Sequence, residues 1–238
     1  MPPDSVDSAD SIDSAETAPL EAALFDFGGV FTDSPFSAAR SLGTELGTEP
    51  ERVLELVFGP YDADTDHPWH RLERGEISLV EARDEILVLG RAEGVESDPF
   101  RVFQRMAGSH GAREAVVDRA RRLRAAGVRT ALVTNNIIEF RERWRQLIPV
   151  DELFEFVVDS SEVGVRKPNP RIFQLALERL GGIAPEGTLF IDDWEGNVAA
   201  ARSLGMRGLL VEEDPRSTLD ELDRILDGLE NRARPRRA

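Results

Sequence analysis

Residues 22–27 read AALFDF, a short apolar run that stops at the pair Gly28-Gly29. A run of this length, closed by turn-forming residues, is typical of a strand that is buried on both faces. Comparable runs follow at 128–134 (VRTALVT), near 153–158, at 188–192 (TLFID) and at 207–211. We therefore expect five strands, and the segment 22–27 is the first of them.

Helical patterns separate these strands along most of the chain. Residues 112–126 carry apolar side chains at helical spacing and end at Gly127, which favours a helix terminus there. Further helices are expected at 136–147, 170–180, 194–204 and about 216–229. Because strands that alternate with helices form βαβ units, the sequence predicts an α/β fold with a Rossmann-like, doubly wound parallel sheet.

Residues 35–107 interrupt this alternation. Helical stretches are expected near 36–46, 50–58, 67–74, 78–90 and 98–107, and no clear strand lies between them. We interpret 35–107 as an all-helical domain inserted after the first strand. The core domain would then comprise residues 21–34 and 108–230.

The two ends of the chain differ in composition from the rest. Residues 1–20 are acidic, repeat Asp-Ser every three residues and contain neither aromatic nor basic side chains, so we expect a disordered tail. Residues 231–238 (NRARPRRA) are basic and are expected to be frayed.

The composition narrows the classes of function. The 238 residues include no cysteine, which excludes disulfides and thiolate chemistry. A formal net charge of −16 disfavours nucleic acid and anionic membranes as partners. No apolar run approaches the ~18 residues of a membrane-spanning helix, and no signal peptide is apparent, so a cytoplasmic location is expected. The sequence leaves the oligomeric state open.

Three of the expected strands end in residues with chemically useful side chains. Asp26 follows the run AALF, Thr134 follows ALV, and the pair Asp192-Asp193 follows LFI. In open parallel sheets, ligands bind at the carboxyl ends of the strands. We therefore expect these four side chains to converge on one cleft.

Lys167 is the only lysine among 29 basic lysine and arginine residues, and it lies in the loop GVRKPNP. A compact ammonium and a planar guanidinium are not interchangeable in a tight site. The single lysine therefore indicates a position where a point charge is needed, and we expect it in the same cleft.

Four motifs together resemble the haloacid dehalogenase-like (HAD) hydrolase superfamily, over nearly all of residues 21–225. In chain order they read LFDFGGVFTD (24–33), ALVTNN (131–136), GVRKPNPRIF (164–173) and FIDDWEGN (190–197). The place of the helical segment is similar to that of the family's C1 cap. The third motif and the stretch WHRLERGEISLVEA (69–82) are most similar to the phosphatase-type N-terminal domain of soluble epoxide hydrolases and its bacterial relatives.

The resemblance implies a magnesium-dependent phosphatase of small phosphorylated metabolites. Asp26 would attack phosphorus and form an aspartyl-phosphate. The implied ligands of Mg²⁺ are Asp26, the backbone carbonyl of Gly28 and Asp193, whereas Asp192 would orient the surrounding groups.

The resemblance also implies how the phosphate is held. Thr134, together with the backbone and side chain of Asn135, would bind phosphate oxygens. Lys167 would neutralise charge on both Asp26 and the phosphate. Asn197 would anchor Lys167.

Gly28 departs from the pattern of most phosphatases in this superfamily, which carry a general acid there. Such a group is typically worth ~10²–10⁴-fold in rate. Three readings stay open: substrates with good leaving groups, another proton source, or a protein that binds phosphorylated ligands with little turnover. A 2-haloacid dehalogenase also lacks this acid, but generally does not preserve the acidic pair Asp192-Asp193.

The remaining candidates in the helical segment have simpler interpretations. We expect His67 and His70 on a solvated helix rather than at a metal, and His110 is isolated from them. Trp69 and Tyr61 are expected to pack in a core rather than to line a pocket. Trp194, directly after Asp193, is expected at the edge of the cleft.

Overall fold

The fold is built on a parallel sheet of five strands in the order β3-β2-β1-β4-β5, as seen in a computed structural model that describes residues 18–107 and 113–233. The strands are β1 (Ala22–Phe25), β2 (Arg129–Thr134), β3 (Val157–Asp159), β4 (Thr188–Asp192) and β5 (Arg207–Leu210). All four pairings between neighbouring strands are parallel. This confirms the predicted α/β fold.

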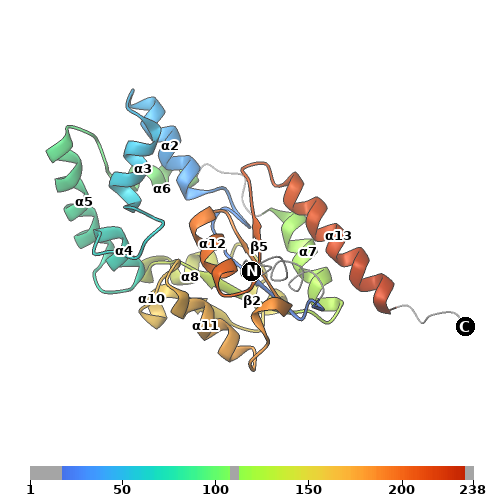
Figure 1. Ribbon diagram of the computed structural model, residues 1–238. Helices are drawn as coiled ribbons and strands as arrows, with labels where there is room; N and C mark the ends of the chain where they lie inside the picture. Colours follow the sequence, from blue (N-terminus) through green and yellow to red (C-terminus); the bar gives the residue numbers. More distant parts are fainter. Residues whose placement is uncertain (1–17, 108–112, 234–238) are drawn as a thin grey trace, which may run out of the picture.

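Alternation along β1 explains why both faces of the sheet are covered. Ala23 and Phe25 join one apolar cluster with residues of α7 (Glu114–Ala125) and α13 (Arg216–Ala233). Ala22 and Leu24 join a second cluster, which includes residues of α11 (Pro170–Arg179) and α12 (Glu195–Ser203). Successive side chains of a strand point to opposite faces, so helices pack on both sides of the sheet (Figure 1).

Two expected elements are shorter than the sequence pattern suggests. The helix expected at 136–147 is a 3-10 turn, η1 (Ile138–Phe140), followed by α8 (Arg141–Trp144). Asn136 lies outside it because its side chain donates to Asp159 (2.8 Å) and its backbone N–H to Ser160 (3.0 Å). The strand expected near 153–158 begins only at Val157, because α9 (Val150–Leu153) takes up the first of these residues and a connection, 154–156, follows it.

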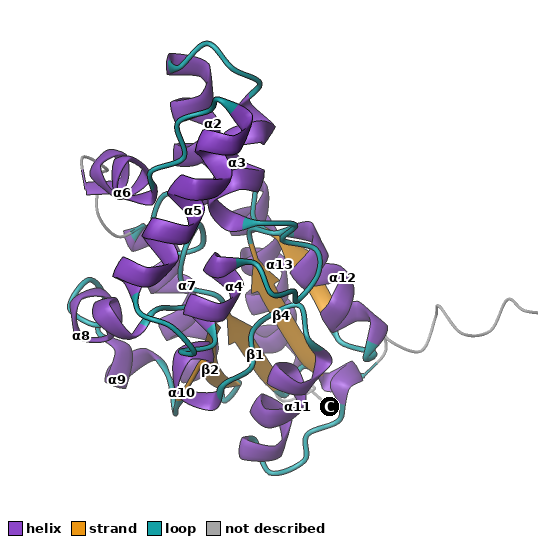
Figure 2. Ribbon diagram, turned by 90° about the vertical axis from the view of Figure 1, so that its left-hand side faces the viewer, coloured by secondary structure: helices purple, strands orange, loops and turns teal. Residues whose placement is uncertain are grey.

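Residues 35–107, which we call the helical insertion, form five helices. They are α2 (Pro35–Glu45), α3 (Pro50–Phe58), α4 (Pro68–Glu73), α5 (Leu79–Glu93) and α6 (Pro99–Ala107). Four of the five begin with proline, whose fixed φ and missing N–H suit the first helical turn. The helices gather beyond one end of the sheet (Figure 2) around an apolar cluster of their own.

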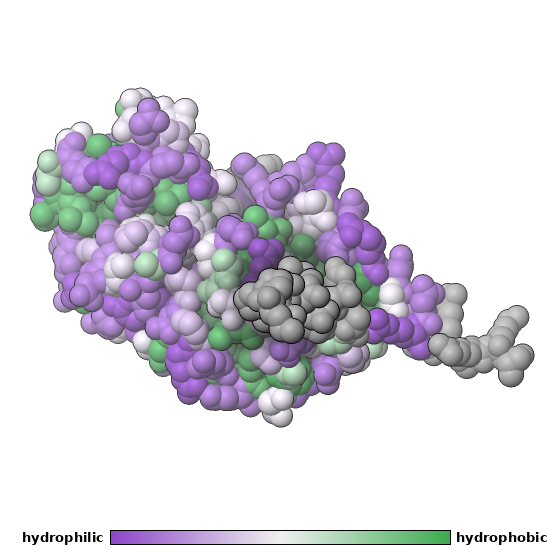
Figure 3. Space-filling view, viewed as in Figure 1, coloured by the Kyte–Doolittle hydropathy of each residue, from purple (hydrophilic) through white to green (hydrophobic). Residues whose placement is uncertain are grey.

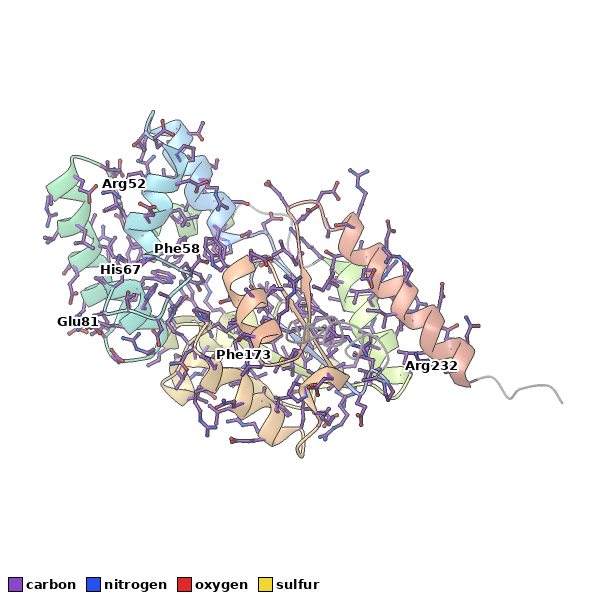
Figure 4. All side chains as sticks on the ribbon, in the orientation of Figure 1. Arg52, Phe58, His67, Glu81, Phe173 and Arg232 are labelled. Carbon is purple, nitrogen blue, oxygen red and sulfur yellow. The ribbon has the colours of Figure 1, made fainter. Side chains whose placement is uncertain are left out.

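The apolar cluster of the helical insertion also takes in residues from outside it. Ile137 is buried there, and Trp194 packs against it. Phe58 lies on the side of the insertion that faces the sheet, whereas Phe173 lies among the core helices (Figure 4). The division into two domains therefore stays a prediction, because one apolar cluster crosses the expected boundary.

The remaining short elements, α10 (Ser160–Val163) and η2 (Pro185–Gly187), connect the core. Near the N-terminal end of the described residues, Leu20 is buried in the core cluster. Residues 1–17 and 234–238 of the expected tails, and His110, lie outside the described residues. Within the described ranges, no helix combines the length and the apolarity that crossing a membrane requires.

The face of the molecule seen in Figure 3 is largely hydrophilic, in keeping with the composition. An apolar area lies at its left edge, where Figure 1 places α5. Val80 and Val88 of this helix are 63% and 55% exposed.

Candidate active site

The strand order reverses between β1 and β4, because the chain runs outward through β2 and β3 and returns on the other side of β1. Ligands in open α/β sheets bind at such a switch point. Asp26 directly follows β1, and Asp192 ends β4. The backbone N–H of Asp26 donates to the carbonyl of Ile191 (2.8 Å), which holds the two strand ends side by side.

Lys167 joins the two strand ends electrostatically. Its Nζ lies 2.7 Å from Oδ1 of Asp26 and 2.7 Å from Oδ2 of Asp192. The side chain is only 1% exposed, so this ammonium interacts with its carboxylate neighbours with little screening by water. The single lysine therefore lies where the sequence analysis expects it.

Both carboxylate oxygens of Asp192 are occupied by donors. Oδ2 accepts from Lys167, Oδ1 accepts from the backbone N–H of Trp194 (2.8 Å), and the Asn197 amide donates to both (3.1 and 3.2 Å). Asn197 thus contacts Asp192 rather than Lys167, the partner that the family resemblance implies. Asn197 and Lys167 therefore donate to the same carboxylate.

Asp193 completes a group of three carboxylates with Asp26 and Asp192, whose ligand oxygens all lie within 4.8 Å of one another. Burial raises the pKa of Asp26 to about 7; Lys167 opposes this shift, and Asp192 adds to it. Burial also raises the pKa of Asp193 well above its usual value. Lys167 has a raised pKa because Asp192 and Asp26 outweigh the effect of its own burial.

Three ionised carboxyl groups together with one ammonium leave a surplus of negative charge. A divalent cation would balance this surplus, and hard oxygen donors are the ligands that Mg²⁺ prefers. The residues present therefore fit the magnesium site that the sequence analysis expects.

The loop after β1 is shaped around Asp193. Gly29 has φ +71°, and a Cβ there would lie 1.9 Å from Oδ2 of Asp193. The hydroxyl of Ser34 donates to the same oxygen (2.5 Å). At Gly28, by contrast, a Cβ would meet only Pro35, at an ordinary contact distance of 3.6 Å. Gly29 is therefore required by the geometry, and Gly28 is not.

Thr134 ends β2 beside β1 and is 4% exposed. The next residue, Asn135, departs from its expected role. Its amide nitrogen donates to the carbonyl of Lys167 (3.0 Å) and to the hydroxyl of Tyr61 (3.1 Å), and its amide oxygen accepts from the N–H of Lys167 (2.7 Å). This side chain therefore holds the Lys167 loop and Tyr61 instead of being free for phosphate.

Three features near the site were not predicted from the sequence: the hydrogen bonding of Tyr61 and the burial of Glu73 and Arg166. Tyr61, the only tyrosine, is packed in the apolar cluster as expected, but its hydroxyl donates to Glu73 (2.8 Å). Arg166 is fully buried and donates to the same carboxylate (2.6 Å). The one available signal was the position of Arg166 directly before the single lysine.

The expectation of solvated histidines is wrong for His70. This side chain is fully buried, and its Nδ1 accepts from the backbone N–H of Thr65 (3.1 Å). His67 instead caps α4, accepting from the N–H of Trp69 (3.2 Å). Burial lowers the pKa of His67 to about 4 and that of His70 to about 3.

A cavity of about 480 Å³ lies beside Asp193, between Phe36 of α2 and the residues that follow β4 and β5. Trp194 lines it together with Asp193. Asp26 does not line the cavity and is 8% exposed. The nucleophile candidate is thus largely covered.

Comparison with known proteins places these motifs in one family. A family model described as haloacid dehalogenase-like hydrolase matches residues 20–205. This range takes in β1, the helical insertion and all the site residues named above. Phosphatase MT3486 of Mycobacterium tuberculosis (strain CDC 1551 / Oshkosh) is 33% identical over 220 residues, which cover 88% of this chain and 98% of that protein.

Two further relatives are much longer than this chain. Bifunctional epoxide hydrolase 2 of Mus musculus is 25% identical over 219 residues, covering 87% of this chain and 39% of that protein. Acyl-CoA dehydrogenase family member 10 of Mus musculus is 29% identical over 209 residues, covering 86% of this chain and 19% of that protein. The similarity to epoxide hydrolases predicted from the third motif and residues 69–82 is confirmed, and the chain spans less than half the length of either relative.

Solved structures share the fold. A predicted HAD-like family hydrolase from Porphyromonas gingivalis aligns with a TM-score of 0.61 and 26% identity over 87% of this chain and 99% of that one. L-2-haloacid dehalogenase from Xanthobacter autotrophicus aligns with a TM-score of 0.53 and 19% identity over 81% of this chain and 77% of that one. The second likeness is one of fold alone.

Proposed function

The chain belongs to the haloacid dehalogenase-like hydrolase family, and on that premise we propose that it is a magnesium-dependent phosphatase of small phosphorylated metabolites. The observation that carries the proposal is the arrangement at the ends of β1 and β4, where three carboxyl groups lie together and two of them, Asp26 and Asp192, pair with the ammonium of Lys167. Such a site attracts a divalent cation and, through it, a phosphate. The full-length similarity to a phosphatase supports the same reaction.

Asp26 supplies the nucleophile in this proposal. One carboxylate oxygen attacks phosphorus, and the bond from phosphorus to the leaving-group oxygen breaks, with its electron pair staying on that oxygen. Water then attacks the aspartyl-phosphate, the bond from phosphorus to Asp26 breaks, and inorganic phosphate leaves. Two easier steps replace one difficult step. Lys167, 2.7 Å away, favours the ionised form of Asp26 that the first step needs.

Mg²⁺ would be held by Asp26, the carbonyl of Gly28 and Asp193, and when bound it would offset the negative charge that Asp26 and a phosphate bring together. Asp192 is left out of this set, because donors already occupy both of its oxygens. Its role is to orient Lys167.

Thr134 and the backbone of Asn135 would hold phosphate oxygens. The side chain of Asn135 is left out of this set because it already binds the backbone of Lys167. The helical insertion would act as the cap that excludes water from Asp26. Gly28 offers no proton to the leaving group, so the proposal favours substrates whose leaving groups need little protonation.

Release of inorganic phosphate tests the proposal. p-Nitrophenyl phosphate and acyl phosphates are incubated with the protein and Mg²⁺, with excess EDTA in a parallel series. We expect turnover that EDTA abolishes and that the Asp26→Asn variant lacks. Equal rates for the wild type and Asp26→Asn would overturn the assigned nucleophile.

Gly28 also favours a second candidate, a 2-haloacid dehalogenase, in which the carboxylate of Asp26 would attack carbon without a metal. Halide release from 2-haloacids that persists in EDTA would select this reaction. Thermal stabilisation by phosphorylated metabolites without turnover of any ester would select a third reading, a phospho-ligand binding protein.

A further inference from the structure

Glu73, the last residue of α4, is a buried carboxylate at the joint between the helical insertion and the core. Its exposed fraction is 3%. Oε1 accepts from the hydroxyl of Tyr61 (2.8 Å) and from the indole N–H of Trp69 (2.8 Å). Oε2 accepts from Nε of Arg166 (2.6 Å), and the Glu73 carbonyl accepts from the hydroxyl of Ser160 (2.6 Å). The residue thus binds two donors from the insertion and two from the core.

Arg166 makes the first connection from Glu73 to the site. Its side chain is fully buried, its guanidinium lies 4.5 Å from the centroid of the Tyr61 ring, and it donates to the carbonyl of Ala63 (3.0 Å). A buried cation needs a paired anion, and Glu73 is that anion. Because Arg166 precedes Lys167, the ion pair also fixes the backbone that carries the ammonium.

Tyr61 makes the second connection. Its hydroxyl donates to Glu73 and accepts from the amide of Asn135 (3.1 Å). That amide in turn binds both the N–H and the carbonyl of Lys167. The same carboxylate therefore reaches Lys167 from two sides, through Arg166 and through Tyr61 with Asn135.

We propose that Glu73 is a positioning residue, which aligns the Lys167 ammonium between Asp26 and Asp192 by holding Arg166 and Tyr61. The helical insertion would then help to assemble the reacting groups as well as cover them. Its kinetic consequence rests on the proposed phosphatase function, whereas its structural consequence at Lys167 does not.

Glu73→Gln tests the kinetic consequence, because it keeps the size of the side chain and removes the charge that pairs with Arg166. We expect kcat for p-nitrophenyl phosphate to fall at least about tenfold, as is common when a misplaced group acts mainly in the transition state, with KM changed less than about threefold. The matched control is Asp98→Asn, which disrupts another carboxylate–arginine pair of the insertion, Asp98 with Arg83 (2.6 Å). The control should keep kcat within about twofold, since it does not touch the site.

The single lysine provides a readout that needs no turnover. In protein labelled with ¹³C and ¹⁵N only in lysine, the Cε–Nζ group of Lys167 gives one NMR signal. Glu73→Gln should shift or broaden this signal, and Asp98→Asn should leave it unchanged. Tyr61→Phe, which keeps the ring and removes only the hydroxyl, should cause a smaller change of the same kind and serves if Glu73→Gln does not fold.

The two readouts separate the two proposals. A wild type without phosphatase activity, whose Lys167 signal still responds to Glu73→Gln and not to Asp98→Asn, would defeat the proposed function and support the positioning role. An unchanged kcat and an unchanged Lys167 signal in Glu73→Gln would overturn the positioning role. Equal losses of kcat in Glu73→Gln and Asp98→Asn would also overturn the positioning role, because they would indicate a general loss of stability.

Discussion

Gly28 stands two residues after Asp26, the proposed nucleophile, where a general acid would stand in most related phosphatases, and the structure leaves room for a Cβ atom there. A Cβ there would contact only Pro35, at 3.6 Å. We expect Gly28→Asp to speed hydrolysis of alkyl phosphates by up to ~10²-fold, because their leaving groups need a proton, and to help acyl phosphates much less. The measurement is kcat/KM for both classes, with Gly28→Asn as a control of equal size. A uniform loss in both would show that the missing acid does not limit the reaction.

Gly29, one residue further, does not tolerate a side chain. Gly29→Ala would place a methyl group 1.9 Å from Oδ2 of Asp193 in a backbone with φ +71°. Asp193 would have to move, so we expect Mg²⁺ to lose most of its stabilising effect on the melting temperature. Gly127→Ala is the matched control, since Gly127 has φ +89° and open space around it. Equal melting curves for the two variants with Mg²⁺ would contradict the expected clash.

His70 should make the stability of the protein depend on pH. Its folded-state pKa is lowered to about 3 from 6.5, chiefly by burial, with Arg166, His67 and Arg74 adding to the effect. Between these values the unfolded chain binds a proton that the folded chain excludes, so the free energy of unfolding falls as pH falls below 6.5. At pH 5 this loss is about 2 kcal/mol relative to pH 7.5.

The variant that isolates this effect is His70→Asn, whose amide oxygen can still accept from Thr65. Urea unfolding at pH 7.5 and at pH 5 gives the free energy of unfolding of each protein. The difference between the two pH values should be smaller in the variant by about 2 kcal/mol. Parallel pH dependences would show that His70 does not titrate in this range.

At the scale of the elements, the turn after α4 packs directly on α10. A Cβ at Gly75 would lie 2.7 Å from the carbonyl oxygen of Ser161, whereas Gly94, at the end of α5, has nearly the same φ and no atom within 4 Å. In both alanine variants the free energy of unfolding should fall by about 1 kcal/mol, because alanine is strained in the left-handed backbone conformation. Gly75→Ala should lower the free energy of unfolding by more than Gly94→Ala does. It should also lower kcat, because it moves α4, and with it Glu73, away from Arg166. Equal values of kcat would argue against this coupling.

The strand ends could be predicted from the sequence because their signal is local. Short apolar runs that stop at polar residues place Asp26 and Asp192 at one edge of the sheet, whatever the helices do. Lys167 was identifiable by its rarity. The helix expected at 136–147 was overestimated, because nothing local shows that Asn136 is tied to Asp159 and Ser160.

The joint of the helical insertion could not be predicted, for a physical reason. Glu73 lies in the stretch RLERGE and has the local pattern of a solvated helix end, while its partner Arg166 is 93 residues away. Periodicity indicates which residues of a helix are apolar, but not which polar residue a tertiary contact will bury. The same limit explains why neither the contacts of the Asn135 side chain nor the burial of His70 was predicted.

At the scale of the whole molecule, the negative net charge opposes the approach of an anionic substrate. The chain carries a formal charge of −16, against which the proposed phosphate substrate would have to approach Lys167 and the proposed cation. At ~0.01 M ionic strength the Debye length is ~30 Å, longer than the roughly 18 Å radius of gyration of a chain of this size, so an approaching anion feels the total charge. At physiological salt the Debye length is ~8 Å, and the repulsion is confined to nearby groups.

We therefore expect kcat/KM for p-nitrophenyl phosphate, a dianion, to rise severalfold as NaCl is raised from about 10 to 150 mM at saturating Mg²⁺. The value of kcat should stay constant, because a bound substrate has already passed through the electrostatic field of the net charge. Phosphoethanolamine, whose ammonium offsets part of the phosphate charge, should show a shallower dependence if it is turned over. A fall in kcat/KM with added salt would mean that the positive charge at Lys167 and the metal dominates the approach of substrate, despite the 45 acidic residues of the chain.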